Sequence, residues 1–243
     1  MSETRIVVLG KTGVGKSSLA NTIFGEKVFE ARSSANSVSA CCESITKEVT
    51  SITVNNCNLL KWIDTPGLFD TGREKEMKSE ILKCLTECHP GPHVFLIVLK
   101  VDRHTSQEQA VINKLQEYFS KGALEYAILL FTGGDQLDEG TTIQEFVYEN
   151  EGLRQLLEKC GNRVHVVDNK YWGENKDVYR SNRYQVSELF RTIEQMKIAN
   201  GGRFYTNSFL QLSMEEIMLK TYSCTAGALL LAFLGKAVLD SAT

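Results

Sequence analysis

A glycine-rich loop at residues 10–17, Gly-Lys-Thr-Gly-Val-Gly-Lys-Ser, constrains the fold of this chain more than any other feature. It matches the G-x-x-x-x-G-K-[ST] pattern of a phosphate-binding P-loop. The β-branched run at 4–9 is typical of a buried strand, and the helical spacing of 17–24 ends at Gly25. A strand, a glycine loop and a helix N-terminus in this order surround phosphate oxygens with backbone N–H groups. We therefore predict a nucleoside triphosphate site at this turn.

Side chains of three residues extend this prediction to a metal ion. Lys16 can reach the β- and γ-phosphates, and the hydroxyl of Ser17 can ligate Mg²⁺. A second strand, 59–63, runs into the Asp-Thr-Pro-Gly tetrapeptide at 64–67. An Asp-x-x-Gly at a strand end downstream of a P-loop is typical of G proteins, in which the Asp holds Mg²⁺ through water and the Gly N–H meets the γ-phosphate. Asp64 and Gly67 take these positions.

Two later strands end in residues suited to reading a base. The strand 126–131 runs into the Thr-Gly-Gly-Asp tetrapeptide at 132–135. Asp135 could accept hydrogen bonds from the N1–H and the exocyclic amine of guanine, and it would repel the acceptor edge of adenine. The strand 163–167 leads to Asn169, which could approach the base from the other side. The sequence therefore favours guanine.

Four passages of the chain resemble the GIMAP (IAN) family of immunity-associated, septin-related GTPases: 10–17, 63–71, 90–98 and 102–108. The last two are similar to the box that this family has between its third and fourth G motifs. The likeness covers about residues 3–200. It implies a G domain that uses GTP or GDP with Mg²⁺ and that assembles through its nucleotide face with copies of itself or with related GTPases.

The chain departs from this family in two places. Ser39 stands where the family has Thr in the first switch region, which keeps a hydroxyl for Mg²⁺. Gly133 and Gly134 replace the side chains of the base motif, so the lysine or arginine that would lie over the guanine ring is missing. Asp135 remains to select the base.

Hydrolysis is the least constrained prediction. Many small G proteins position the attacking water with a Gln directly after Asp-x-x-Gly, and here that place holds Leu68. Intrinsic hydrolysis is therefore expected to be slow. Arg103 lies in the passage that resembles the Arg-bearing loop of the family, where an arginine supplied to a partner's phosphates can be worth roughly 10³–10⁵ in rate. The alternatives are that Arg103 is a solvated loop charge and that the protein is a non-hydrolysing, GTP-bound scaffold.

The candidate nucleotide-binding residues are Gly10, Lys11, Thr12, Gly13, Val14, Gly15, Lys16, Ser17, Ser18, Gly67, Gly133, Gly134, Asp135 and Asn169. The candidate metal ligands are Ser17, Ser39 and, through water, Asp64. The candidate catalytic residue is Arg103, acting in trans. A small-molecule kinase would explain neither Asp64 nor Asp135.

Net charge, the N-terminal residues and the cysteine count bear on which partners the protein binds and in which compartment it lies. The formal net charge of −3 over 243 residues gives no basis for nucleic-acid binding. No signal segment separates Met1 from the first strand, which favours a cytoplasmic start. Seven cysteines in such a chain predict free thiols. Four potential zinc ligands lie within 84–93, but the Pro-Gly-Pro run at 90–92 interrupts them, so we expect the thiols to pack at a helix end.

The order of strand and helix patterns predicts an α/β fold: a P-loop NTPase G domain with a mostly parallel sheet and helices on both faces. Along the chain we expect an edge strand at 44–54, strands at 92–101, 125–131 and 163–168, and helices at 73–88, 106–121, 142–160 and 182–198. The insert 171–184, which contains Trp172, is expected to be a surface loop, and the alternative is that it lines the nucleotide edge.

We divide the chain into a G domain at 1–200, an amphipathic helix at 201–220 and a hydrophobic segment at 221–243. At ~1.5 Å per residue, the uncharged stretch 221–235 spans ~22 Å as a helix, short of a ~30 Å hydrocarbon core. Continuing past Lys236 to residue 239 gives ~28 Å if that lysine snorkels. Three interpretations stay open: attachment to an intracellular membrane through 221–239, packing on the G domain, and a partner helix in an oligomer.

Overall fold

The computed structural model describes residues 3–29, 42–50, 57–67, 83–84, 86–102, 121–172 and 177–206. The elements, with η for 3₁₀ helices, are β1 (Glu3–Gly10), α1 (Lys16–Phe24), β2 (Glu43–Thr50), β3 (Cys57–Asp64), β4 (Val94–Lys100), η1 (Lys121–Tyr126), β5 (Ala127–Thr132), η2 (Gly134–Gln136), α4 (Ile143–Tyr148), α5 (Glu151–Lys159), β6 (Val164–Val166) and α6 (Asn182–Ala199).

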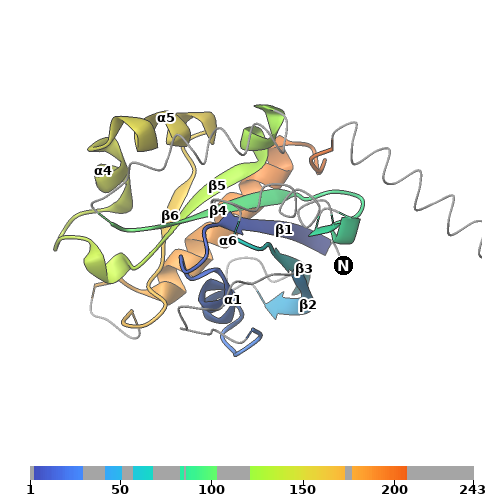
Figure 1. Ribbon diagram of the computed structural model, residues 1–243, viewed down its shortest axis with the longest axis horizontal. Helices are drawn as coiled ribbons and strands as arrows, with labels where there is room; N and C mark the ends of the chain where they lie inside the picture. The colour runs from blue at the N-terminus through green and yellow to red at the C-terminus, as the bar shows by residue number, and fades with distance from the viewer. Residues whose placement is uncertain are drawn as a thin grey trace, which may run out of the picture. The chain divides into compact units, whose positions relative to one another are not determined.

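The strands form one sheet in the order β2-β3-β1-β4-β5-β6 (Figure 1). Of the described strands, β2 at one edge alone runs antiparallel to its neighbour, and the others pair in parallel. The carboxyl ends of β1, β3, β4, β5 and β6 therefore lie along a single edge, where ligands bind in open α/β sheets. The predicted α/β fold is confirmed.

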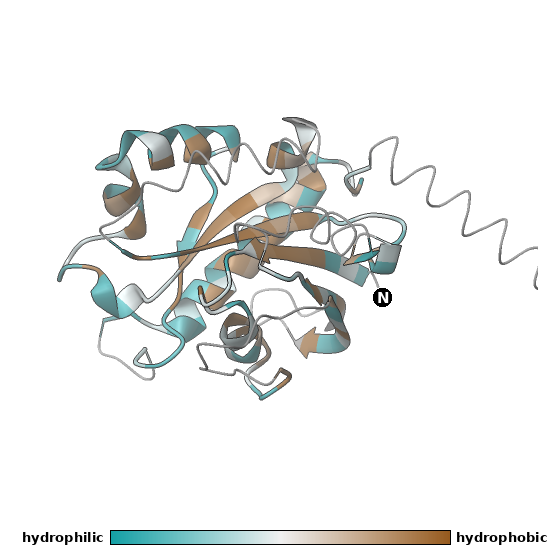
Figure 2. Ribbon diagram, in the orientation of Figure 1, coloured by the Kyte–Doolittle hydropathy of each residue, from teal (hydrophilic) through white to brown (hydrophobic). Residues whose placement is uncertain are grey.

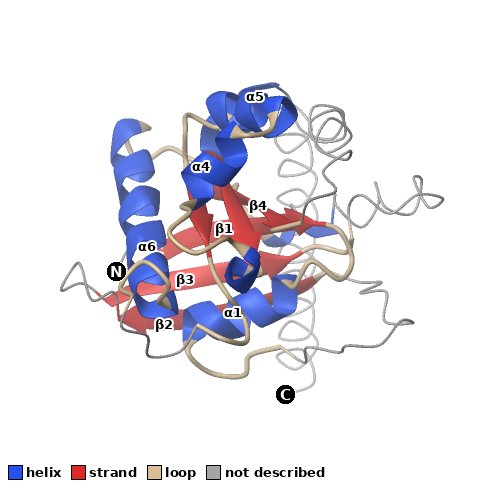
Figure 3. Ribbon diagram, turned by 90° about the vertical axis from the view of Figure 1, so that its left-hand side faces the viewer, coloured by secondary structure: helices blue, strands red, loops and turns tan. Residues whose placement is uncertain are grey.

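Helices cover both faces of this sheet (Figure 3). Leu19 of α1 and Ile193 of α6 belong to a buried cluster with alternate residues of the central strands, such as Val98 and Leu130. The opposite face of β5 meets α4, where the rings of Phe131 and Phe146 pack edge to face at 6.0 Å. Figure 2 shows the hydrophobic residues gathered in the strands, with hydrophilic residues on the outer sides of the helices.

The predicted helix at 142–160 is two helices, α4 and α5. Asn150 interrupts it with an extended backbone, and its side chain accepts a hydrogen bond from the N–H of Leu153. That cap begins α5 afresh, while Thr142 begins α4 with a capping box closed by Glu145. The predicted helix at 73–88 is described only at 83–84 and 86–88. The one at 106–121 lies outside the described residues apart from Lys121, which starts η1.

The prediction of free thiols holds for Cys88 and Cys160, which are free and buried. It is wrong for Cys42 and Cys84, which the structure joins in a disulfide with their Cα atoms 5.6 Å apart. Forty-two residues separate them in sequence, so no local pattern indicated the pair. Among the described residues, no group of three or more His, Cys, Asp or Glu side chains could hold a metal ion.

Contacts divide the chain into two units, Met1–Tyr205 and Thr206–Thr243. Residues 207–243 lie outside the described part of the chain, so the hydrophobic tail remains a prediction. Among the described residues, no helix is long and apolar enough to cross a membrane.

The first unit continues beyond α6 to Tyr205. The N–H of Tyr205 donates to the carbonyl of Pro92 at 2.8 Å. Its ring packs edge to face against Phe95 at 5.1 Å and Tyr126 at 5.9 Å, and only 3% of the residue is exposed. The segment after α6 is thus part of the packed core.

We expect Tyr205→Ala to lower the free energy of unfolding by about 3 kcal/mol, because it removes a buried ring and leaves a cavity. Urea denaturation of the full chain measures this. Ile198→Ala is the control: Ile198 is 76% exposed, and its loss should cost less than about 0.5 kcal/mol. Equal losses in the two variants would show that the segment after α6 does not support the core.

Candidate nucleotide site

The P-loop joins β1 to α1 at the carboxyl edge of the sheet. Gly15, directly before α1, has a left-handed backbone with φ +93°, and a Cβ at this position would lie 2.9 Å from the amide nitrogen of Asn169. Only glycine meets both demands without strain. The carbonyl of Gly15 accepts the N–H of Leu19 at 2.8 Å, which starts the helix. The loop therefore presents the N-terminus of α1 as predicted for a phosphate site.

The side chain of Lys16 turns back over this loop. Its Nζ donates to the carbonyls of Gly10 at 3.2 Å and of Lys11 at 3.0 Å. The residue is only 6% exposed. These bonds hold a buried ammonium directly over the loop that is predicted to receive phosphates.

Ser17 and Asp64 meet across the sheet edge. The Ser17 hydroxyl donates to Oδ2 of Asp64 at 3.0 Å, whereas Oδ1 of Asp64 is buried and finds no hydrogen-bond partner among the described residues. Burial raises the pKa of Asp64 to about 6, although the charge of Lys16 and the hydrogen bond from Ser17 lower it. A buried carboxylate oxygen without a partner, next to a hydroxyl, suits a hard divalent cation such as Mg²⁺.

Thr65 fixes the start of the Asp-x-x-Gly turn. Its hydroxyl donates to the carbonyl of Val8 at 2.6 Å, and its N–H approaches the same oxygen at 3.3 Å. This anchors the end of β3 to β1 just before the buried Gly67. Leu68, Ser39 and Arg103 lie outside the described residues, and their roles remain predictions.

Two further side chains tie the P-loop to the later strands. The hydroxyl of Thr132, at the end of β5, donates to the carbonyl of Val14 at 2.6 Å. The Asn169 side chain donates to the carbonyl of Gly15 at 3.3 Å and accepts from the hydroxyl of Thr22 at 3.1 Å. Asn169 thus reaches the P-loop and α1, whereas the sequence prediction had directed it to the base. Sequence reasoning missed Thr132, because nothing local indicates that its hydroxyl faces the P-loop.

Asp168, in the loop after β6, connects that loop with the loop after β5, which contains Asp135. Its Oδ2 accepts the N–H of Asp135 at 3.1 Å, and its Oδ1 accepts the N–H groups of Lys170 and Tyr171. A side-chain hydrogen bond with Asp168 raises the pKa of Asp135. Burial works against ionisation of Asp168, but the hydrogen bonds that it accepts outweigh burial and lower its pKa. Asp168 is therefore the more acidic of the two and orients the backbone of Asp135. The sequence did not single it out.

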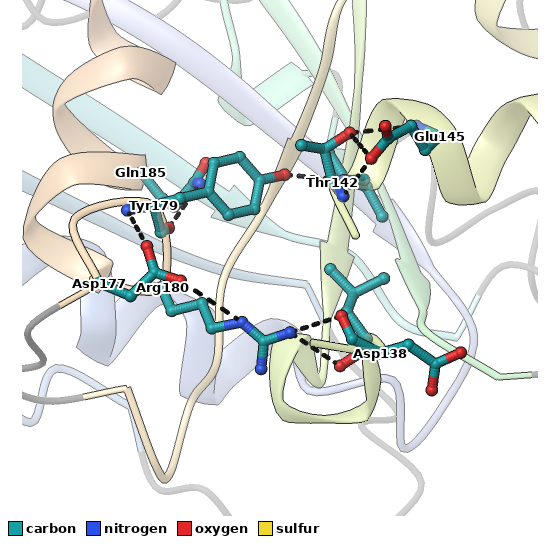
Figure 4. A network of polar contacts seen from close by, with 9 residues as sticks. Asp138, Thr142, Glu145, Asp177, Tyr179, Arg180 and Gln185 are labelled. Carbon is teal, nitrogen blue, oxygen red and sulfur yellow. Dashed lines mark hydrogen bonds and ion pairs between the residues drawn. The ribbon is translucent and has the colours of Figure 1, made fainter. Parts of the chain in front are cut away.

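A polar network braces the turn after Asp135 (Figure 4). Arg180 donates to the carbonyls of Leu137 at 3.0 Å and of Asp138 at 2.6 Å. The hydroxyl of Tyr179 accepts the N–H of Ile143 at 2.7 Å, at the first residue of α4. The segment before α6 and the turn before α4 are thereby held together.

Trp172 corrects the prediction of a surface loop at 171–184. The residue is only 5% exposed, and its ring lies against Gly134, where a Cβ would come within 2.6 Å of the indole. The ring of Tyr179 packs edge to face against the indole, with the two ring centroids 6.5 Å apart. Trp172 therefore packs beneath residues 132–135, the loop that is predicted to hold the base and that we call the base loop.

These features together define the class of protein. A P-loop between β1 and α1, a Ser–Asp pair reaching the end of β3, and two joined loops after β5 and β6 are the parts of a G domain of the P-loop NTPase class. The model of the AIG1 family matches residues 4–223. The chain belongs to the AIG1 family, which confirms the resemblance seen in the sequence.

Known proteins with similar sequences and folds agree with this assignment. The chain is 37% identical over 216 residues to immune-associated nucleotide-binding protein 8 of Arabidopsis thaliana, covering 87% of this chain and 58% of that protein. It is 33% identical over 220 residues to immune-associated nucleotide-binding protein 9 of the same organism, covering 88% of this chain and 61% of that protein. The chain thus spans about three-fifths of these relatives. A dimerisation-deficient mutant of Toc33 from Arabidopsis thaliana shares the fold, with a TM-score of 0.63 and 20% identity over 84% of this chain and 87% of that one.

We expect Asp64→Asn to stabilise the protein when nucleotide and Mg²⁺ are absent. Because the folded-state pKa of about 6 exceeds the ordinary 3.8, ionisation of Asp64 lowers stability as the pH rises from about 4 to about 6. Removing the charge should therefore add about 3 kcal/mol at pH 8 and about half of that at pH 5.

Urea denaturation across this pH range measures the effect. Glu158→Gln, at an exposed position of α5, is the matched control and should show no such trend. A gain that does not change with pH would mean that the charge of Asp64 is not the cause.

Proposed function

We propose that this protein is a GTP-binding switch that dimerises or oligomerises in its GTP state and hydrolyses GTP slowly or on dimerisation. The observation that carries the proposal is the placement of Ser17 and Asp64 beside the P-loop, with one buried carboxylate oxygen left for a cation. When bound, Mg²⁺ would supply charge neutralisation to the phosphates. Structures of Toc33 with GDP and Mg²⁺ and with GMPPNP and Mg²⁺ support the same ligands here.

Guanine is the base that the site favours. Asp135 carries its carboxyl group in η2, directly after β5, where we propose that it accepts hydrogen bonds from the guanine edge. Its N–H is held by Asp168, which is almost fully buried. Because the pKa of Asp135 is raised, recognition by its carboxylate weakens as the pH falls through that pKa.

Dimerisation is the step that we propose links binding to hydrolysis. Dimerisation is described as important for the GTPase activity of the chloroplast translocon components atToc33 and psToc159. In this chain Leu68 cannot position water, so hydrolysis needs a group from elsewhere. We assign that role to Arg103, supplied in trans across the nucleotide face.

A second candidate function is a non-hydrolysing scaffold in which bound GTP stabilises assembly on intracellular membranes. Leu68 and the uncharged stretch at 221–235 favour it. In both cases we propose a cytoplasmic location, with 221–239 as the segment that attaches to a membrane.

Single-turnover hydrolysis of GTP by the full chain, over a wide range of protein concentration, separates the two functions. For the switch, we expect the rate per molecule to rise with concentration and to fall by at least about 100-fold in Arg103→Ala, as for loss of an arginine finger. Equilibrium binding of GDP and ADP in the same samples should favour GDP. Tight GTP binding with a flat, near-zero rate would favour the scaffold, and failure to bind GDP would overturn both.

Attachment through the tail is tested by flotation with liposomes of neutral phospholipid. We expect the full chain to float with the vesicles and a 1–220 truncation to stay behind, because the truncation removes the uncharged stretch. Lys220→Ala in the full chain keeps that stretch and should float like the wild type. Equal behaviour of full chain and truncation would remove the membrane from the proposal.

A further inference from the structure

The base loop lacks a long side chain at the two positions where the family resemblance would place one. Gly133 has a left-handed backbone with φ +75°, which disfavours any residue with a Cβ. Gly134 lies against the indole of Trp172, which occupies the space that a side chain would need. The loop is therefore built around two glycines, and a cation for the base has to come from another element.

Lys100 lies beside the open side of Gly133. It is the last residue of β4 and pairs in register with Thr132, the residue before Gly133. Its Cγ and Cε each lie 3.8 Å from the position that a Cβ on Gly133 would take. The aliphatic stem of Lys100 therefore runs along the glycine at ordinary contact distance.

The strand register puts Lys100 at the nucleotide edge of the sheet. Two residues earlier in β4, Val98 pairs with Gly10, the first residue of the P-loop. Residues in register on neighbouring strands share a face of the sheet. Lys100 thus shares a face with Thr132, whose hydroxyl binds the P-loop carbonyl of Val14.

The ammonium group of Lys100 has no hydrogen bond or ion pair among the described residues, and the side chain is exposed. Asp102, Asp138 and Glu149 line a hollow beside it. Lys100 therefore has two candidate uses: it can cover the base, or it can balance the negative charge of these three carboxylates.

We propose that Lys100 replaces the missing lysine of the base loop, placing its stem against the purine ring and its ammonium group at the ring face or the ribose. The inference rests on the proposed binding of guanine nucleotides. A cation over an aromatic ring is attracted to its π face, and Lys100 reaches this position from a neighbouring strand instead of from the loop itself. Lys100 would then strengthen binding without selecting the base, and selection would remain with Asp135.

Equilibrium binding of a fluorescent GDP analogue to the full chain tests the proposal. We expect Lys100→Ala to weaken binding by about 10-fold, Lys100→Arg to keep most of the affinity, and Lys100→Met to fall between them, since it keeps the stem and loses the charge. Lys159→Ala, an exposed lysine in the last turn of α5, should bind as the wild type does.

The choice of base separates a ligand contact from a structural role. Lys100→Ala should weaken GDP and IDP by the same factor, because a cation over the ring does not touch the exocyclic amine that IDP lacks. Asp135→Asn should instead reduce the preference for GDP over IDP.

Wild-type affinity in Lys100→Ala, with or without a lowered melting temperature, would overturn the inference. Lys100 would then serve only to balance the charge of the nearby carboxylates. Lost affinity in Lys100→Arg as well would also overturn it, because the charge and stem are kept. If the wild type binds neither GDP nor IDP, the proposed function itself fails. A wild type that binds GDP together with an unaffected Lys100→Ala rejects the inference about Lys100 alone.

Discussion

The buried carboxylate of Asp64 is the group on which the rest of the site depends. It sits at the end of β3, 5% exposed, with Ser17 on one oxygen and nothing on the other among the described residues. Burial makes its negative charge costly, and the nearby charge of Lys16 only partly offsets that cost. A cation at the free oxygen would remove the penalty. The buried charge of Asp64 thus lowers the stability of the fold and favours the binding of a metal ion.

The P-loop and the end of β1 that leads into it are held by side chains from three other strand ends. Thr65 after β3 binds the carbonyl of Val8, Thr132 at the end of β5 binds that of Val14, and Asn169 after β6 binds that of Gly15. Each bond fixes a backbone oxygen of β1 or of the loop. The parallel register makes this possible because it brings all of these strand ends to one edge. Loss of any of these three side chains would therefore remove a contact that positions the backbone of β1 or of the P-loop.

The sequence predicted those parts of the site that depend on local chemistry. Glycine spacing, a helix start and an acidic residue at a strand end are local patterns, and the structure places the loop between β1 and α1 and Asp64 at the end of β3. It could not predict contacts between distant segments: Thr132 reaches Val14 across 118 residues, and Cys42 pairs with Cys84. The break between α4 and α5 depends on the side chain of Asn150, which accepts the N–H of Leu153 and starts a second helix.

The two glycines of the base loop show how one motif can be read differently in sequence and in structure. In sequence, a glycine in place of a lysine indicates a weakened base site. In the structure, Gly134 makes room for Trp172, which packs on Tyr179, and the hydroxyl of Tyr179 caps the first N–H of α4 at Ile143. A side chain at Gly134 would displace the indole and disturb the start of α4. The glycine is therefore required by the packing beneath the loop, and its presence says little by itself about how well the loop holds a base.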